Sequence, residues 1–121
     1  MNAADWWSIE VTDAEDAEIS AALWRDAYGQ MLTESLVTNG AVQWEWFEQT
    51  WGVVLEVSFQ DEELWLLWRS LPGTQAALDA VPDPLGGLLV HRGHGGASGS
   101  YVPRNPRIAP VADQVALTEP R

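Results

Sequence analysis

Apolar and polar residues alternate over residues 6–11. A period of two is the spacing of a strand that buries only one of its faces. We therefore predict a first strand here, with one side toward the core and the other side facing away. The core side carries Trp7, Ile9 and Val11, and the other side carries Trp6, Ser8 and Glu10.

The apolar spacing then lengthens to three and four residues, which is typical of one face of a helix. Asp13 is a candidate N-cap, and the acidic residues after it suit the positive end of a helix dipole. The spacing continues past Gly29 to about Val37, and Asn39-Gly40 then offers a left-handed stop. The predicted apolar face consists of Ala17, Ala21, Trp24, Tyr28, Met31, Leu32 and Leu36.

A second interpretation ends this helix at Gly29. It makes the Asn-Gly pair a type I′ turn between strands at 31–37 and 41–47. The helix accounts better for the pattern, because adjacent apolar residues such as Met31 and Leu32 would point to opposite faces of a sheet.

The next segment predicts a β-hairpin. Alternation over residues 42–46 and again over 53–59 indicates two strands, which are separated by a short turn that ends in Gly52. Trp44 and Trp46 lie on the core side of the first strand. The side facing away from the core carries Glu45, Phe47 and Glu56.

A second helix is predicted to begin after Asp61, which is a candidate N-cap with two glutamates in the first turn. Pro72 cannot continue this helix without the loss of a hydrogen bond. We therefore predict either a kink or a restarted helical turn that carries residues 76–81. The expected core stripe of the helix is Leu64, Leu67, Trp68 and Leu71.

Residues 85–91 complete the pattern as a last strand. Leu88 and Val90 face one way, and Leu89 and His91 face the other. The order strand, helix, strand, strand, helix, strand is the split βαβ pattern of the ferredoxin-like fold. We predict an α+β domain in which a four-stranded antiparallel sheet carries two helices on one face and leaves the other face open.

Charge divides the chain into two parts. Residues 1–90 contain 16 acidic residues and 2 arginines, a net charge of −14. Residues 91–121 contain 2 acidic residues and 4 arginines, a net charge of +2, together with several glycines and prolines. Such a composition buries too little apolar area to offset its ordering entropy. We predict an acidic domain over residues 1–92 and a flexible or extended tail over residues 93–121.

The composition excludes several classes of function. The formal net charge of −12 repels phosphates, so we expect neither a nucleic acid nor a membrane as partner. We find no signal peptide and no apolar run that could span a bilayer, which indicates a cytoplasmic protein. The lack of cysteine excludes thiol catalysis and a Cys zinc site. No motif identifies a catalytic residue, a metal ligand or a cofactor.

The open face of the predicted sheet is one candidate site. Parity places Glu10, Glu45, Glu56 and Phe47 on it, and His91 of the last strand can join them. Three carboxylates near an imidazole could hold a divalent cation or provide a general base. Polar residues on an uncovered sheet face are also the ordinary solvated outcome. We assign no metal ligand there.

Tryptophan accounts for eight of the twelve aromatic residues. The run from Leu64 to Trp68 is apolar on all sides of a helix, which indicates either deep burial or a second buried surface. Aromatic side chains with an apolar surround are common anchors of protein interfaces. We therefore predict a partner or homodimer surface at Trp65, Leu66, Trp6 and Trp51.

The tail offers a different kind of contact. Its glycine-rich part lacks the lysine of a phosphate-binding loop, and no helix start follows it. Arg92, Arg104 and Arg107 are separated by prolines. In an extended chain they could lie along an acidic surface of the body or reach a partner, while a merely flexible tail is the simpler interpretation.

Two functions follow from these features. The first is a non-catalytic acidic interaction module, an adaptor or regulator that binds another protein and could imitate the charge of nucleic acid. The alternative is a small-molecule-binding protein or a cofactor-independent enzyme of the oxygenase or isomerase type. In that case two open sheet faces would pack together, an arrangement that resembles the dimeric α+β barrels of secondary metabolism. The enclosed pocket would be lined by Trp6, Glu10, Phe47, Glu56 and His91.

Overall fold

Four antiparallel strands form one sheet within residues 4–93, the part of the chain that the computed structural model describes. The strands are β1 (Asp5–Thr12), β2 (Gln43–Gln49), β3 (Gly52–Phe59) and β4 (Leu88–Arg92). Their order across the sheet is β2-β3-β1-β4, so the first and last strands are neighbours. This is the strand order of the split βαβ unit. The predicted ferredoxin-like α+β fold is confirmed, and the predicted tail lies outside the described residues.

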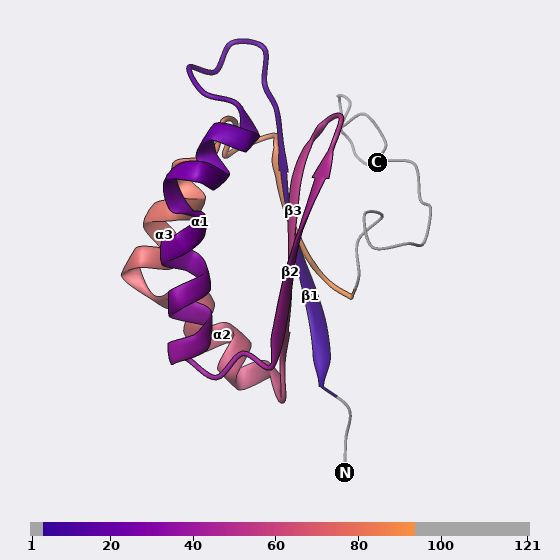
Figure 1. The fold of residues 1–121 in the computed structure, drawn as a ribbon, viewed down its shortest axis with the longest axis vertical. Coiled ribbons are helices and arrows are strands. Elements are labelled where there is room, and N and C mark those ends of the chain that lie inside the picture. The colour runs from indigo at the N-terminus through magenta and orange to yellow at the C-terminus, as the bar shows by residue number, and fades with distance from the viewer. Residues whose placement is uncertain (1–3, 94–121) are drawn as a thin grey trace.

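Helices cover one face of this sheet (Figure 1). They are α1 (Ala21–Thr38), α2 (Glu62–Ser70) and α3 (Pro72–Asp79). The second predicted helix is divided in two, because Pro72 lacks an N–H and occupies the first turn of a new helix. Leu71 is both the C-cap of α2 and the N-cap of α3. Within the described residues, no helix has the length and apolar character that crossing a membrane requires.

The first helix begins later than the sequence predicted. Asp13 is not its N-cap, and the following residues, Ala17 included, form a loop. The N-cap is Ser20, whose hydroxyl accepts a hydrogen bond from the backbone N–H of Leu23 at 3.1 Å. Asp13 still serves the helix, because its Oδ1 accepts from the N–H of Ala21 at 2.7 Å. Two side chains therefore share the capping role that we assigned to one.

This second cap can be tested by Asp13→Ala, which leaves the N–H of Ala21 without its carboxylate acceptor. We expect a loss of about 1 kcal/mol in the free energy of unfolding, the usual cost of removing a helix cap. Urea unfolding followed by circular dichroism measures it. Asp16→Ala removes a carboxylate from the same loop and should cost less than about 0.5 kcal/mol. Equal losses in both variants would refute the capping role.

Residues 30–38 are helical, so the hairpin interpretation of this segment is wrong. Leu32 and Leu36, one turn apart on α1, are both buried against the core. That burial requires helical spacing, as the apolar pattern indicated. The helix ends at the predicted place, because Gly40 has a φ of +92° and supplies the left-handed residue after the C-cap.

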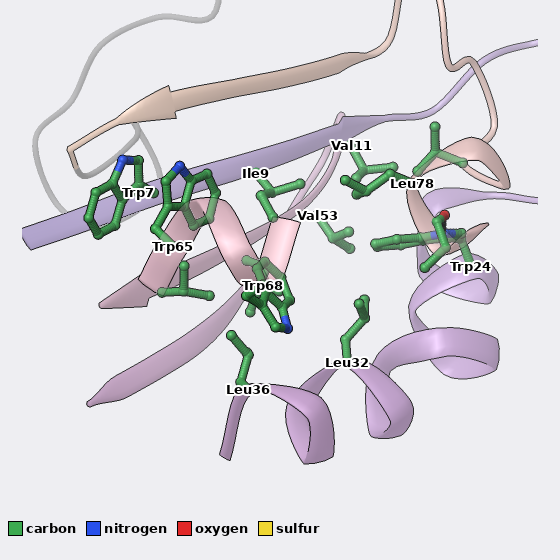
Figure 2. Close-up of a cluster of buried hydrophobic side chains, with 14 of the residues drawn as sticks. Trp7, Ile9, Val11, Trp24, Leu32, Leu36, Val53, Trp65, Trp68 and Leu78 are labelled. Atoms are coloured by element: carbon green, nitrogen blue, oxygen red, sulfur yellow. Dashed lines mark hydrogen bonds between the residues drawn. The ribbon is translucent and has the colours of Figure 1, made fainter. Parts of the chain in front are cut away.

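The core lies between the helices and the sheet (Figure 2). Two fully buried indoles connect the helices: Nε1 of Trp24 on α1 donates to the carbonyl of Ala77 on α3 at 2.8 Å. Nε1 of Trp68 on α2 donates to the hydroxyl of Ser35 on α1 at 2.6 Å. Each bond satisfies an N–H that would otherwise be buried without an acceptor. Both tryptophans were predicted core residues.

The core stripe of α2 differs from the prediction. Leu67 was expected inside but is 58% exposed, whereas Trp65 is only 4% exposed. The indole of Trp65 stacks on that of Trp7 from β1, with ring centroids 5.0 Å apart and planes 7° apart (Figure 2). Phe59 of β3 and Trp68 also lie beside it, at 6.3 and 5.9 Å between centroids. An aromatic cluster from three elements therefore fixes the rotation of α2.

Candidate functional site

The register of the sheet places the predicted face residues together on the side away from the helices. Two neighbouring rows of side chains cross that face, each with one residue from every strand in the order β2, β3, β1, β4. The first row is Glu45, Glu56, Ser8 and His91, and the second is Phe47, Val54, Glu10 and Leu89. Strand parity alone was enough to assign these side chains to one face.

Burial differs sharply between the carboxylates of this face. Glu10 and Glu56, on the two central strands, are each 1% exposed, whereas Glu45 on the edge strand is exposed. No helix of the described chain lies on this side of the sheet (Figure 1). Burial of an ionised carboxylate is costly unless hydrogen bonds or opposite charges compensate it. The two central glutamates are therefore not the solvated polar residues that an uncovered sheet face usually carries.

Glu10 makes a short contact that joins two strands. Nε2 of His91 on β4 lies 2.8 Å from Oε2 of Glu10 on β1. The imidazole is 32% exposed, while the carboxylate is 1% exposed. When Nε2 carries its proton it donates to the carboxylate, which orients the ring. The pair thus has one member that solvent reaches and one that solvent does not.

Ser8, between Glu56 and His91 in the first row, was not among the predicted site residues. Its hydroxyl donates to the carbonyl of Gly93 at 2.6 Å, and the N–H of Gly93 donates to the carbonyl of Trp6 at 2.6 Å. Ser8 therefore holds the end of β4 rather than the imidazole. Its shared parity with Glu10 was the signal that could have identified it.

A divalent cation site on this face is not supported. Among residues 4–93, no three His, Cys, Asp or Glu side chains gather closely enough to hold a metal ion. Glu45 is exposed on the edge strand, and Glu10 contacts His91. The cation hypothesis that parity left open therefore has no geometric basis in this part of the chain.

The residues predicted as a partner surface do not form one surface. Trp65 belongs to the core, so the expectation that its indole anchors a partner is corrected. Leu66 is 54% exposed on α2, in the helix layer. Trp6 is partly buried and points to the opposite side of the sheet, and Trp51 is partly buried in the turn between β2 and β3. In the apolar run of α2, Trp65 and Trp68 are buried, whereas Leu66 and Leu67 are exposed. Burial therefore explains only one side of this helix.

Arg92 is the one predicted tail contact that lies within the described residues. Its guanidinium is 3.0 Å from Asp5 and 3.4 Å from Glu62, and it stands 5.1 Å from the ring centroid of Trp7. On the far side of the stacked indoles, Arg69 stands 5.4 Å from the ring centroid of Trp65. Burial lowers the pKa of Arg69, although a guanidinium remains charged at neutral pH. Arg104 and Arg107 lie outside the described residues.

A hollow of about 520 Å³ lies elsewhere, between α1 and the edge strand β2. It is wide open to solvent, and a salt bridge of 3.3 Å between Arg25 and Glu48 lies at the same edge. Its lining residues are Arg25, Asp26, Gly29, Gln30, Thr33 and Trp46. This hollow contains none of the residues that the sequence predicted as a site, so the sheet face remains the stronger candidate.

Comparisons with known proteins address the fold and not the family. The sequence matches no family of known proteins and no curated protein. It is similar in structure to Rv0793 from Mycobacterium tuberculosis, with a TM-score of 0.57, 14% identity, and coverage of 77% of this chain and 95% of that one. A proposed antibiotic biosynthesis monooxygenase from Deinococcus radiodurans gives a TM-score of 0.53 and 19% identity, with 78% and 93% covered.

A third structure, a DABB family protein with a ferredoxin-like fold from Mesorhizobium loti, gives a TM-score of 0.50 and 15% identity. The match covers 85% of this chain and 100% of that one. At such identities the likeness shows the ferredoxin-like fold alone. Any function must therefore be argued from the residues of this chain.

Proposed function

We propose that the sheet face opposite the helices binds a small organic molecule and that the Glu10–His91 pair exchanges a proton with it. The observation that carries this proposal is the 2.8 Å contact between an imidazole that is 32% exposed and a carboxylate that is 1% exposed. Histidine changes its charge near neutral pH, and a buried carboxylate that holds it is the usual partner of a general acid or base. This function corresponds to the small-molecule alternative of the sequence analysis.

The surroundings of the pair indicate the class of molecule. Phe47, Val54 and Leu89 stand in the same row as Glu10 and offer apolar contact to a carbon skeleton. Nearby carboxylates repel an anionic ligand, so a neutral molecule with a weakly acidic proton fits best. Phenols and enolisable ketones meet both conditions.

The comparisons support this proposal at the level of the fold. One structural neighbour is described as a proposed monooxygenase of antibiotic biosynthesis, and another as a DABB family protein. A fold shared with such proteins favours small-molecule chemistry over a non-catalytic adaptor, although folds host many functions. The adaptor has weaker support, because its main anchor, Trp65, lies in the core. Exposed Leu66 and Leu67 on α2 are the observation that still favours it.

The test is a binding screen of neutral phenols and enolisable ketones, monitored by NMR of the full chain. We expect binders to shift the signals of the His91 ring and of the methyl groups of Val54 and Leu89. His91→Ala should weaken binding about tenfold or more, because a hydrogen bond to a charged group contributes about 1.5–3 kcal/mol. Glu10→Gln should have a similar effect.

A matched control is Glu63→Gln, which removes one exposed carboxylate from α2 and should leave the affinity unchanged. If His91→Ala and Glu63→Gln bind with the same affinity as the original chain, the pair has no role in binding. If the probes shift only signals from the helices, the site lies elsewhere and the proposal fails.

A further inference from the structure

β2 is an edge strand of the sheet within residues 4–93, where it is hydrogen-bonded to β3 alone. None of its seven residues is buried, whereas all eight residues of β3 are buried. An edge strand presents backbone N–H and C=O groups that can pair with another chain. β2 contains neither proline nor lysine, two residues that commonly protect such an edge. It therefore offers a pairing edge of about 23 Å, at about 3.3 Å per residue.

The hollow between α1 and β2 adjoins this edge and is open to solvent. Asp26, Gln30 and Thr33 line it from the helix, and their spacing of four and three residues places them on one helix face. Trp46 lines it from β2. With about 520 Å³, the hollow has room for a side chain of a strand that lies beside β2.

Gly29 lines the same hollow from the middle of α1, where it is buried. Glycine inside a helix is destabilising relative to alanine. Sterically, alanine would fit, because a Cβ at this position would meet Cγ of Arg25 at 3.5 Å and Cζ2 of Trp46 at 3.6 Å, both ordinary contact distances. The benefit of glycine here is space, since a longer side chain would project into the hollow beside the indole.

The charge around this edge is negative. α1 and β2 carry one basic residue, Arg25, and four acidic residues, namely Asp26, Glu34, Glu45 and Glu48. Arg25 is paired with Glu48 at 3.3 Å. Asp26 is exposed and makes no ion pair within the described part of the chain. Such an edge attracts a basic segment and repels a second acidic edge like itself.

We propose that β2 binds an extended basic segment of a partner protein as an additional strand, and that an arginine or lysine of that segment enters the hollow and pairs with Asp26. In this mode of recognition the backbone hydrogen bonds provide affinity, and pockets for alternate side chains provide specificity. Successive side chains of a strand point to opposite faces, so every second one faces the helix layer and the hollow. The inference goes beyond the proposed function, because it concerns the sheet edge and does not depend on a small molecule.

The test is an NMR titration of the full chain with a synthetic peptide as long as β2, in which arginine alternates with threonine. We expect the amide signals of β2 and the indole N–H signal of Trp46 to shift. The amide signals of β4, the other edge strand, should stay in place. Equal shifts along the two edges would mean that the peptide binds by charge alone, which overturns the proposal.

A control peptide has the same sequence but carries N-methyl groups on two adjacent central residues. Neighbouring N–H groups of a strand point to opposite sides, so one donor is then missing from the side that faces β2 in either orientation. This peptide should bind about fivefold more weakly or less, because it loses a backbone hydrogen bond and adds a bulky group at the pairing edge. Equal affinities for the two peptides would refute strand addition.

Two pairs of variants test the hollow. Gly29→Gln fills it and should weaken binding of the arginine peptide about tenfold, whereas Ala27→Gln places the same side chain on an exposed position of α1 outside it. Asp26→Arg should weaken binding to a similar extent, whereas Asp79→Arg makes the same change of charge at an exposed position of α3. Asp26 is exposed, so this variant leaves the core intact. If Asp26→Arg binds the peptide as tightly as Asp79→Arg, no basic side chain pairs in the hollow and the proposal fails.

A dilution series of the chain alone decides whether a second copy takes the edge instead. We expect the amide signals of β2 to be independent of protein concentration, because two copies of this edge carry the same negative charge. Shifts of these signals on dilution would show that a second copy pairs with β2, which contradicts the assignment of a basic partner.

Discussion

Trp65→Ala is expected to lower the free energy of unfolding by about 3–5 kcal/mol, the usual cost of deleting a buried tryptophan side chain. The indole is 4% exposed and stacks on Trp7, with Phe59 and Trp68 beside it. Its loss leaves a cavity among three aromatic rings and removes a stacking interaction of about 0.5–1.5 kcal/mol. Urea unfolding with circular dichroism detection measures the change.

The matched control is Leu66→Ala, one residue along the same helix and 54% exposed. It should change the free energy of unfolding by no more than about 0.5 kcal/mol. Light scattering should report the same mass for both variants as for the original chain, under conditions where Trp65→Ala is still folded. A change of mass with little loss of stability would instead assign Trp65 to an interface and would contradict its burial.

The sequence could not determine that Trp65 faces the core, and we predicted it wrongly as a partner-surface residue. In the run Leu64-Trp65-Leu66-Leu67-Trp68 every residue is apolar, so helical periodicity cannot decide which side faces the sheet. The rotation is set by Trp7, which lies on a strand far away in the sequence. Only the packed structure contains that information.

Strand parity was far more reliable. The alternation in β1, β2 and β3 assigned Glu10, Glu45 and Glu56 to the face away from the helices, and the register agrees. Parity has only two outcomes, and one face of each strand had to be apolar. The order of elements likewise left few topologies to consider.

The Glu10–His91 contact could not be predicted in the same way. It requires β4 to lie beside β1 in a register that offsets the two residues by one row, and local pattern does not specify this. The prediction of where α1 begins was wrong for a related reason. Asp13 and Ser20 are both good N-cap residues, and the path of the loop between them determines which one caps the helix.

The register that aligns Glu10 with its neighbours depends on a glycine at the end of the hairpin. Gly52 pairs with Thr12, and its φ of +155° lies in a region that side chains rarely adopt. A Cβ at this position would overlap the backbone carbonyl oxygen of Val11 and approach the Cα of Thr12 to 3.0 Å. Because the obstacles are backbone atoms, β1 and β3 would have to move apart.

We expect Gly52→Ala to cost about 3 kcal/mol or more in the free energy of unfolding, from backbone strain together with the steric overlap. NMR of the variant should show shifts along the β1–β3 pairing, including Glu10. Gly73→Ala is the control, because its Cβ would meet only Sδ of Met31 at 3.6 Å, within the first turn of α3. Alanine suits that position, so this variant should be neutral or more stable by about 0.4–1 kcal/mol. Similar stabilities for the two variants would show that the close approach of β1 to Gly52 does not constrain the sheet.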